Sequence, residues 1–159
     1  MTQHEQWMKQ ALREAEKAAA EDEIPVGAVV VHKGAVIGRG RNQIERLQDP
    51  TAHAEMIAIT AAAGHLESRR LKDCTLYATL EPCPMCAGAI VLARIPTIVF
   101  ATFDPKAGAC GTLYNIVHDK RLNHTVHVIS GVCDRESELL LKGFFGKVRS
   151  IVPRIETSR

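Results

Sequence analysis

Two short motifs, about thirty residues apart, constrain this chain more than any other feature of its sequence. The first is His53-Ala54-Glu55 and the second is Pro82-Cys83-Pro84-Met85-Cys86. Residues three apart lie on one face of a helix, so Cys83 and Cys86 can hold one ion from a single helix end. Thiolates and a histidine nitrogen are ligands that zinc prefers. We therefore expect His53, Cys83 and Cys86 to bind one Zn²⁺ per chain.

Three protein ligands would leave one coordination position open. A structural zinc site uses four protein ligands, so the fourth position of a three-ligand site is available to water. Glu55 lies two residues after His53 and is not needed as a ligand. A carboxylate beside a zinc-bound water is placed for proton transfer. The pattern predicts a catalytic zinc with Glu55 as the proton shuttle.

Each motif alone is ambiguous. An H-x-E triplet is common in helices, and His53 could be a core histidine. A C-x-x-C pair can be half of a structural zinc site, a redox pair or two core cysteines. The prolines on both sides of Cys83 disfavour a redox pair, and a structural site needs a fourth ligand, for which the candidates are Cys74, Cys110 and Cys133. The two motifs together, each opening an apolar helical stretch, favour the catalytic site.

Composition indicates one globular domain over residues 1–159. The chain is 46% hydrophobic and 24% charged, with a formal net charge of +2, which neither requires nor excludes a nucleic-acid partner. Its five cysteines lack the spacing of a disulfide framework, which favours a reducing cytosol. We find no apolar signal region and no segment long enough to span a bilayer, and we expect a cytoplasmic protein.

Hydrophobic periodicity predicts the order of the helices and strands. Helices are expected over 1–23, from Thr51 to Gly64, over 84–94 and over 134–148, and strands over 26–31, 35–40, 74–80, 97–101 and 125–129, with 113–122 short or irregular. Thr51 is expected to cap its helix, Gly64 to end it, and Gly34 to form the turn of a hairpin. This order predicts a three-layer α/β/α sandwich around a mixed five-stranded sheet. The helices that follow the two motifs should pack side by side, with their N-termini meeting at the metal.

Several polar residues lie near the predicted strand ends. Asn42 follows the second strand, and its amide could bind a nucleobase, although a turn asparagine is the simpler interpretation. Asp104 and Lys106 lie in a loop after the fourth strand and are candidate substrate contacts or a solvated turn. The C-terminal end is basic and could contact phosphates or form a solvated helix end; its cations are Lys142, Lys147, Arg149, Arg154 and Arg159.

These residues together resemble the cytidine deaminase superfamily, for which H-x-E followed by P-C-x-x-C is a signature. The resemblance is closer to bacterial tRNA-specific adenosine deaminases and covers nearly the whole chain. It rests on the two motifs with Pro25 to Ala28, Asn42, Ala87 to Ala89, Asp104 to Ala109 and Phe144-Phe145. It implies a cytidine deaminase-like fold and a homodimer that converts adenosine to inosine at the wobble position of a tRNA anticodon.

Two other functions share parts of this pattern. A deaminase of a free base or nucleoside would use the same zinc chemistry but would need no basic rim for RNA. A zinc-binding module without enzymatic activity would need a fourth protein ligand. In the favoured interpretation, Glu55 takes a proton from the zinc-bound water, hydroxide attacks C6 of adenine, and ammonia leaves. Asn42, Asp104 and Lys106 would bind the nucleotide or its neighbours.

Overall fold

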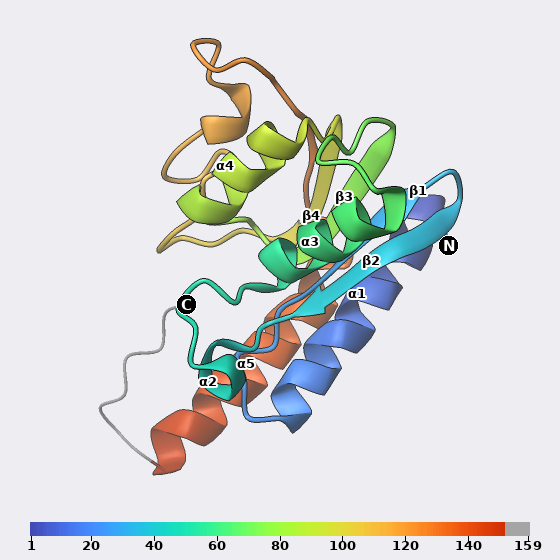
Figure 1. Cartoon of the computed structure of the whole chain (residues 1–159). Helices are drawn as coiled ribbons and strands as arrows, with labels where there is room; N and C mark the ends of the chain where they lie inside the picture. Colours follow the sequence, from blue (N-terminus) through green and yellow to red (C-terminus); the bar gives the residue numbers. More distant parts are fainter. Residues whose placement is uncertain (152–159) are drawn as a thin grey trace.

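The structure is a computed structural model, and it describes residues 1–151. Its elements are α1 (Gln3–Ala20), β1 (Gly27–His32), β2 (Ala35–Arg41), α2 (Ile44–Leu47), α3 (Ala54–Leu66), β3 (Cys74–Leu80), α4 (Pro84–Ala93), β4 (Thr97–Thr102), the 3₁₀ helix η1 (Ile116–His118), β5 (His127–Ile129) and α5 (Asp134–Ile151). Figure 1 shows their arrangement.

The five strands form one mixed sheet in the order β2-β1-β3-β4-β5. β1 is antiparallel to β2 and to β3, whereas β3, β4 and β5 run parallel. The hairpin between β1 and β2 turns at Lys33 and Gly34, whose φ angles are 49° and 74°. Two consecutive positive φ angles are typical of the tight hairpin turn that glycine permits. The predicted sheet and hairpin are therefore confirmed.

Helices cover both faces of the sheet. α3 and α4 pack on the face that carries Val30, Leu76 and Phe100, while α1 and α5 cover the face that carries Val29 and Tyr77. Neighbouring residues of one strand point to opposite faces, so the run of valines in β1 is buried on both sides. Figure 1 shows the resulting three layers, which confirm the predicted α/β/α sandwich.

Glycines let two helices approach the hairpin closely. A Cβ added to Gly27 would lie 2.0 Å from the backbone oxygen of Ala11 in α1. A Cβ on Gly40 would lie 2.1 Å from the oxygen of Ala54, at the start of α3. No real Cβ fits at such distances. The lack of a side chain at both positions therefore allows the two helices to pack close to the sheet.

Several predicted element boundaries were wrong. α1 ends at Ala20, before the predicted residue 23. His53, and not Thr51, is the N-cap of α3, because the hydroxyl of Thr51 donates instead to Asp49 Oδ1 at 2.7 Å. α3 continues through Gly64 to Leu66 and ends at Glu67, which adopts the left-handed conformation with φ 52°.

The segment after β2 also contains a short helix that the sequence did not predict. α2 begins where the buried carboxylate of Glu23 accepts hydrogen bonds from the amides of Glu45 and Arg46, at 3.1 and 2.8 Å. A carboxylate at a helix N-terminus satisfies amides that have no partner within the helix. The predicted last strand is shorter than expected and covers only His127–Ile129.

The C-terminal prediction is only partly described by the structure. α5 begins at Asp134, as expected, and the side chains of Phe144 and Phe145 pack edge to face with ring centroids 5.6 Å apart. Arg154 and Arg159 lie outside the described residues. Within residues 1–151, no helix combines the length and hydrophobicity needed to cross a membrane.

Candidate active site

Both sequence motifs lie at helix N-termini. His53 is the N-cap of α3, and Cys83 is the N-cap of α4 with Pro84 in its first turn. Cys86 lies one turn further along α4 and is fully buried. Proline suits this position because the first helical amides have no partner within the helix. Since α3 and α4 pack against each other, their starts bring the three predicted ligands together.

The three side chains form a compact donor set. His53 Nδ1 lies 3.5 Å from Cys83 Sγ and 3.6 Å from Cys86 Sγ. One donor atom from each residue lies within 4.8 Å of the others, and all three residues are buried. One imidazole nitrogen and two sulfurs at this separation can share a single ion, and zinc is the metal that such a set prefers. The residues present therefore fit zinc.

The electrostatics of the site favour thiolate over thiol at Cys83. Hydrogen bonds from Cys86 and from His53 lower the pKa of Cys83 to about 4, although burial of the sulfur opposes this shift. The N-terminus of α4 carries a partial positive charge that also stabilises an anion. A thiolate is the form in which cysteine binds a metal, so Cys83 is ready to act as a ligand.

No fourth protein ligand joins this group within the part of the chain that the structure describes. Only His53, Cys83 and Cys86 come together there as a possible metal-binding group. Burial raises the pKa of Cys110 strongly, and the nearby carboxylates of Glu81 and Glu55 add to the effect, so its thiol stays protonated. This arrangement does not support a structural zinc site with four protein ligands.

Glu55 and Asn42 are both fully buried beside the start of α3. Glu55 lies in the first turn of the helix, and its charge acts on Cys83 and Cys110, which places its carboxylate near the thiols. Asn42 Oδ1 accepts a hydrogen bond from the amide of Ala54 at 3.0 Å. Asn42 thus connects the end of β2 to the helix that carries His53 and Glu55.

Asp104 and Lys106 lie on the loop that follows β4. Asp104 Oδ1 accepts hydrogen bonds from the amides of Lys106 and Ala107, at 3.0 and 3.2 Å, and so shapes the turn. The side chain of Lys106 is exposed. The two interpretations of this loop remain compatible, because a turn held by Asp104 leaves Lys106 accessible to a ligand.

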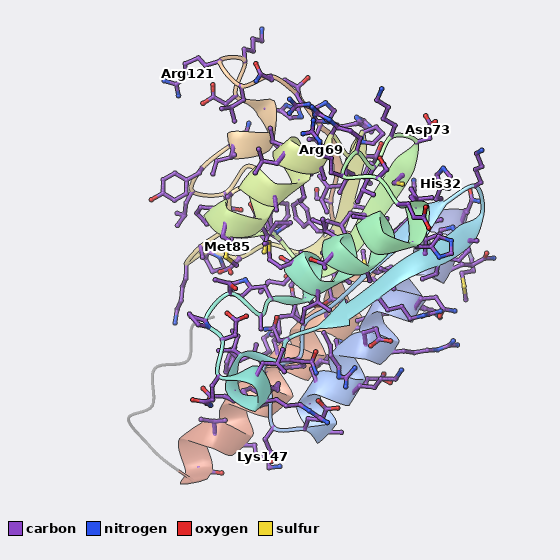
Figure 2. The ribbon with its side chains drawn as sticks, in the orientation of Figure 1. His32, Arg69, Asp73, Met85, Arg121 and Lys147 are labelled. Atoms are coloured by element: carbon purple, nitrogen blue, oxygen red, sulfur yellow. The ribbon has the colours of Figure 1, made fainter. Side chains whose placement is uncertain are left out.

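Sequence reasoning missed Glu81, a fully buried carboxylate two residues before Cys83. Its Oε1 accepts a hydrogen bond from the amide of Asp104 at 3.1 Å, and its Oε2 accepts from the amides of Cys110 and Thr112 at 3.0 and 3.1 Å. A Cβ on Gly108 would lie 2.4 Å from Oε1, so the loop closes tightly around the carboxylate. Glu81 therefore ties the loop of Asp104 to the start of α4. Figure 2 labels Met85, which lies in the first turn of α4.

The comparisons with known proteins agree with this fold. Residues 2–149 match the family of MafB19-like deaminases. A guanine deaminase from Nitrosomonas europaea is 23% identical and superposes with a TM-score of 0.79, and the superposition covers 89% of this chain and 84% of that chain. At this identity, the similarity supports the fold alone. Family, fold and donor set define a hydrolytic deaminase.

Relatives with higher sequence identity show to which group of deaminases the chain belongs. A tRNA-specific adenosine deaminase of Bacillus subtilis is 49% identical over 94% of this chain and 92% of its own length. The enzyme of the same name from Aquifex aeolicus is 44% identical over 92% of this chain and 96% of its own. A solved structure from a study of A-to-I editing by tRNA:A34 deaminases is 42% identical with a TM-score of 0.83, covering 86% of this chain and 99% of that one. The chain belongs to the MafB19-like deaminases and, among them, to the bacterial tRNA-specific adenosine deaminases.

Proposed function

We propose that this protein hydrolyses adenosine to inosine at the wobble position of a tRNA anticodon, in the cytoplasm and as a homodimer of one-domain subunits. One observation carries the proposal. The buried group of His53, Cys83 and Cys86, with Glu55 in the adjoining helical turn, occurs in a chain 49% identical to a tRNA-specific adenosine deaminase.

His53, Cys83 and Cys86 would hold one zinc ion per subunit. When bound, zinc lowers the pKa of a coordinated water and so supplies a nucleophile near neutral pH. Glu55 is buried beside these residues and would act as the proton shuttle. Its carboxylate would accept a proton from the attacking water and deliver protons to the purine ring nitrogen and to the amino group.

In the overall reaction, water replaces the amino group of adenine. A bond forms between the water oxygen and C6 of adenine, and the bond between C6 and the exocyclic amino nitrogen breaks. The products are inosine and ammonia, and Glu55 regains its starting protonation state. The anticodon base is already unpaired in a loop, so extruding it costs less free energy than flipping a base out of a duplex.

Three residues would bind the nucleotide. The amide of Asn42 offers both a donor and an acceptor, and it lies where β2 meets the start of α3. Asp104 and Lys106 lie on the loop that Glu81 ties to the start of α4. This linkage supports a role for the loop at the rim of the site, with Lys106 toward the phosphates.

The outward side of α4 supports the homodimer. α4 is apolar all round its circumference, which is typical of a helix that is covered on every side. In the single chain, however, Gly88 and Ala89 are only half-buried and Leu92 is 74% exposed. These three residues lie on one side of the helix, where a second subunit would cover them.

The experiment is to incubate zinc-loaded protein with bulk tRNA and to locate inosine by sequencing. We expect inosine at the first anticodon position of a tRNA species that carries adenosine there. Ammonia release from tRNA is compared with release from free guanine, cytosine, adenosine and cytidine. Efficient turnover of a free base or nucleoside, with none on tRNA, would contradict the tRNA assignment and favour a small-molecule deaminase.

A further inference from the structure

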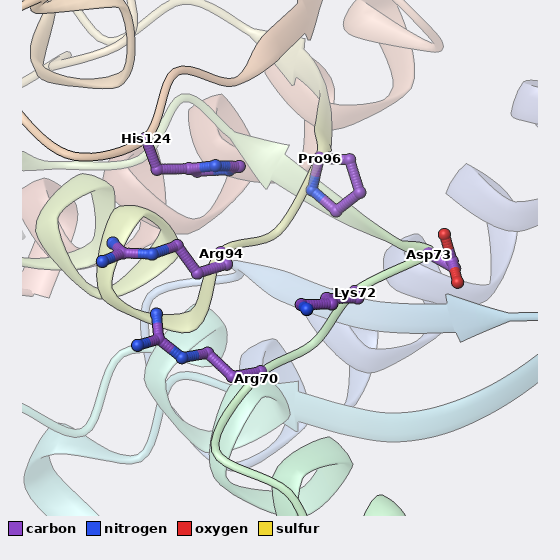
Figure 3. Close-up of a pocket in the computed structure, with 6 residues that line it drawn as sticks. All are labelled: Arg70, Lys72, Asp73, Arg94, Pro96 and His124. Carbon is purple, nitrogen blue, oxygen red and sulfur yellow. The ribbon is translucent and has the colours of Figure 1, made fainter.

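A cavity lies away from the metal-binding residues, at the C-terminal end of α4. Its volume is about 590 Å³, and it is lined by Arg70, Lys72, Asp73, Arg94, Pro96 and His124. Figure 3 shows the charged ends of Arg70, Lys72 and Arg94 on the same side of the cavity, whereas the carboxylate of Asp73 points away from them. The cavity thus gathers three permanent cations from two segments.

These cations are not neutralised by acidic side chains. Among residues 1–151, no ion pair joins Arg70, Lys72 or Arg94 to a carboxylate. The pKa of Arg70 is lowered, first by partial desolvation and then by repulsion from Arg94 and Arg69. Like charges close together without a counter-charge repel one another and raise the free energy of the folded protein. An anionic ligand would offset this repulsion.

The backbone around the cavity is firmly anchored. Leu71, between the two cations Arg70 and Lys72, is fully buried, and its amide donates to the oxygen of Ala93 at 2.8 Å. The hydroxyl of Ser68 accepts from the amide of Arg70 at 3.1 Å. His124 Nε2 lies 2.7 Å from the oxygen of Ile95, another fully buried residue. The cationic side chains therefore extend from a rigid base.

Arginine and lysine side chains that line one cavity are suited to bind phosphate oxygens. Arginine can bind phosphate through two parallel hydrogen bonds, and lysine adds a compact charge. Arg94 also complements the negative C-terminal end of α4, where its Nη1 donates to the oxygen of Val91 at 2.9 Å. Arg70 and Lys72 lie outside any helix, so this effect does not explain them.

We propose that this cavity binds backbone phosphates of the RNA substrate at a distance from the deaminated base. The inference rests on the proposed function. α4 begins at the metal-binding turn and ends at the cavity, and its 10 residues correspond to a helix ~15 Å long at 1.5 Å per residue. A free base or nucleoside at the metal site cannot reach so far. A stacked strand advances about 3.4 Å per nucleotide, so the bound phosphates lie roughly four or five nucleotides from the base.

The experiment uses the zinc-loaded enzyme with Arg70→Gln and Lys72→Gln combined. Two substrates are compared, namely full tRNA and the shortest anticodon-loop oligonucleotide that the wild type deaminates. Each lost single-strand phosphate contact should reduce the slope of log affinity against log salt by about 0.7, and the two together by about 1.4. We expect KM for full tRNA to rise on the order of tenfold, with little change for the short oligonucleotide.

The matched control removes one arginine and one lysine elsewhere. Arg13→Gln with Lys33→Gln alters two exposed cations, on α1 and in the hairpin turn, and should leave KM and the salt slope as in the wild type. Melting temperature and zinc content verify that each variant is folded. Lys72→Glu, at an exposed position, is a second test that should weaken tRNA binding more than Lys72→Gln does.

Three outcomes would overturn the inference. One is a KM and salt slope equal to those of the control, and another is an equal loss on both substrates. The third is tight binding of tripolyphosphate, abolished by the double variant, with unchanged kinetics on tRNA, because that would assign the cavity to a free phosphate ligand. Failure of the proposed function is a separate result, since the wild type itself would then form no inosine in tRNA.

Discussion

Glu55 is a fully buried carboxylate whose negative charge acts to raise the pKa of the thiols of Cys83 and Cys110. A buried charge in a water-poor site is costly unless it has a partner or a function. Glu55 lies in the first turn of α3, directly after the N-cap residue His53 and Ala54, so the start of this helix positions both His53 and Glu55. Proton transfer is the function that we propose for this buried carboxylate, because it lies in the same helical turn as the proposed metal ligand His53.

Glu55→Gln tests that role with little change in shape. The variant should keep its fold and bind zinc, because the three predicted ligands are untouched. Deamination of tRNA should fall by ~10²–10⁴-fold or more, which is the usual contribution of a positioned acid–base group. Single-turnover inosine formation and metal analysis measure the two effects. Near-normal turnover with full zinc content would rule out Glu55 as the proton shuttle.

At the scale of elements, the position of α3 above the hairpin depends on Gly40. Gly40→Ala would bring a Cβ to 2.1 Å from the oxygen of Ala54, so the first turn of α3 must move. Overpacking of this kind typically costs about 1–3 kcal/mol of stability. Because His53 and Glu55 lie in that turn, turnover and zinc affinity should fall as well.

The matched control for this change is Gly64→Ala in the same helix. An added Cβ there has no neighbour within 4 Å, and the position lies inside α3. Alanine should therefore stabilise the helix by roughly 0.5–1 kcal/mol, because it restricts the unfolded chain more than glycine does. Urea unfolding compares the two variants. A stable and fully active Gly40→Ala variant would show that α3 does not depend on this close approach.

The docking of α1 on the sheet predicts a pH dependence at alkaline pH. Tyr77 in β3 contacts His4 of α1 through its hydroxyl at 2.8 Å, and burial raises the pKa of Tyr77 to about 12 from an ordinary value of 10.0. The folded state thus retains this proton more strongly than the unfolded state. Its contribution is complete below pH 10 and is lost as pH rises toward 12.

The expected loss follows from the size of the shift. Two pKa units correspond to about 2–3 kcal/mol of unfolding free energy, lost between pH 10 and 12. Tyr77→Phe has no phenol to ionise, so its free energy of unfolding should decline less over this range. Below pH 10 this variant should be less stable than the wild type, because it lacks the hydrogen bond to His4. Urea unfolding at several pH values compares the two proteins. Parallel stability curves would contradict this assignment.

Local signals in the sequence were sufficient for α4 and for the hairpin. The cysteine spacing with Pro84 marked the start of α4, and Gly34 marked the turn, because both depend on neighbouring residues alone.

The start of α3 was predicted from Thr51, and the prediction was wrong. The amide of Ala54 is satisfied by Asn42, twelve residues earlier, while Thr51 bonds to Asp49. Such a distant cap leaves no trace in the helical pattern.

The same limit applies to the site. His53, Cys83 and Cys86 could be predicted to meet, because zinc chemistry restricts which residues combine, and the structure brings them together. Glu81 could not be found in this way. Its partners are amides of residues 104, 110 and 112, which carry no side-chain signal and come close only in the folded chain.

At the scale of the whole molecule, the exposed side of α4 predicts the oligomeric state. Leu92 is 74% exposed, and an apolar side chain next to the half-buried Gly88 and Ala89 favours association. Leu92→Glu should place a charge in the proposed subunit contact and shift the protein from dimer toward monomer. Sedimentation analysis over a range of concentrations measures this shift. Leu139→Glu, at a 61% exposed position on α5, is the matched control. A dimer unaffected by Leu92→Glu would place the contact elsewhere.

The hydrogen bonds of Glu81 have a consequence for the motions of the molecule. The loop around Asp104 runs over the surface, where backbone amides usually exchange their protons with water quickly. The amides of Asp104, Cys110 and Thr112 donate to a carboxylate that is itself buried next to the start of α4. These protons can exchange only when the loop leaves Glu81. They should therefore exchange together and slowly, at a rate that reports how often the loop leaves Glu81.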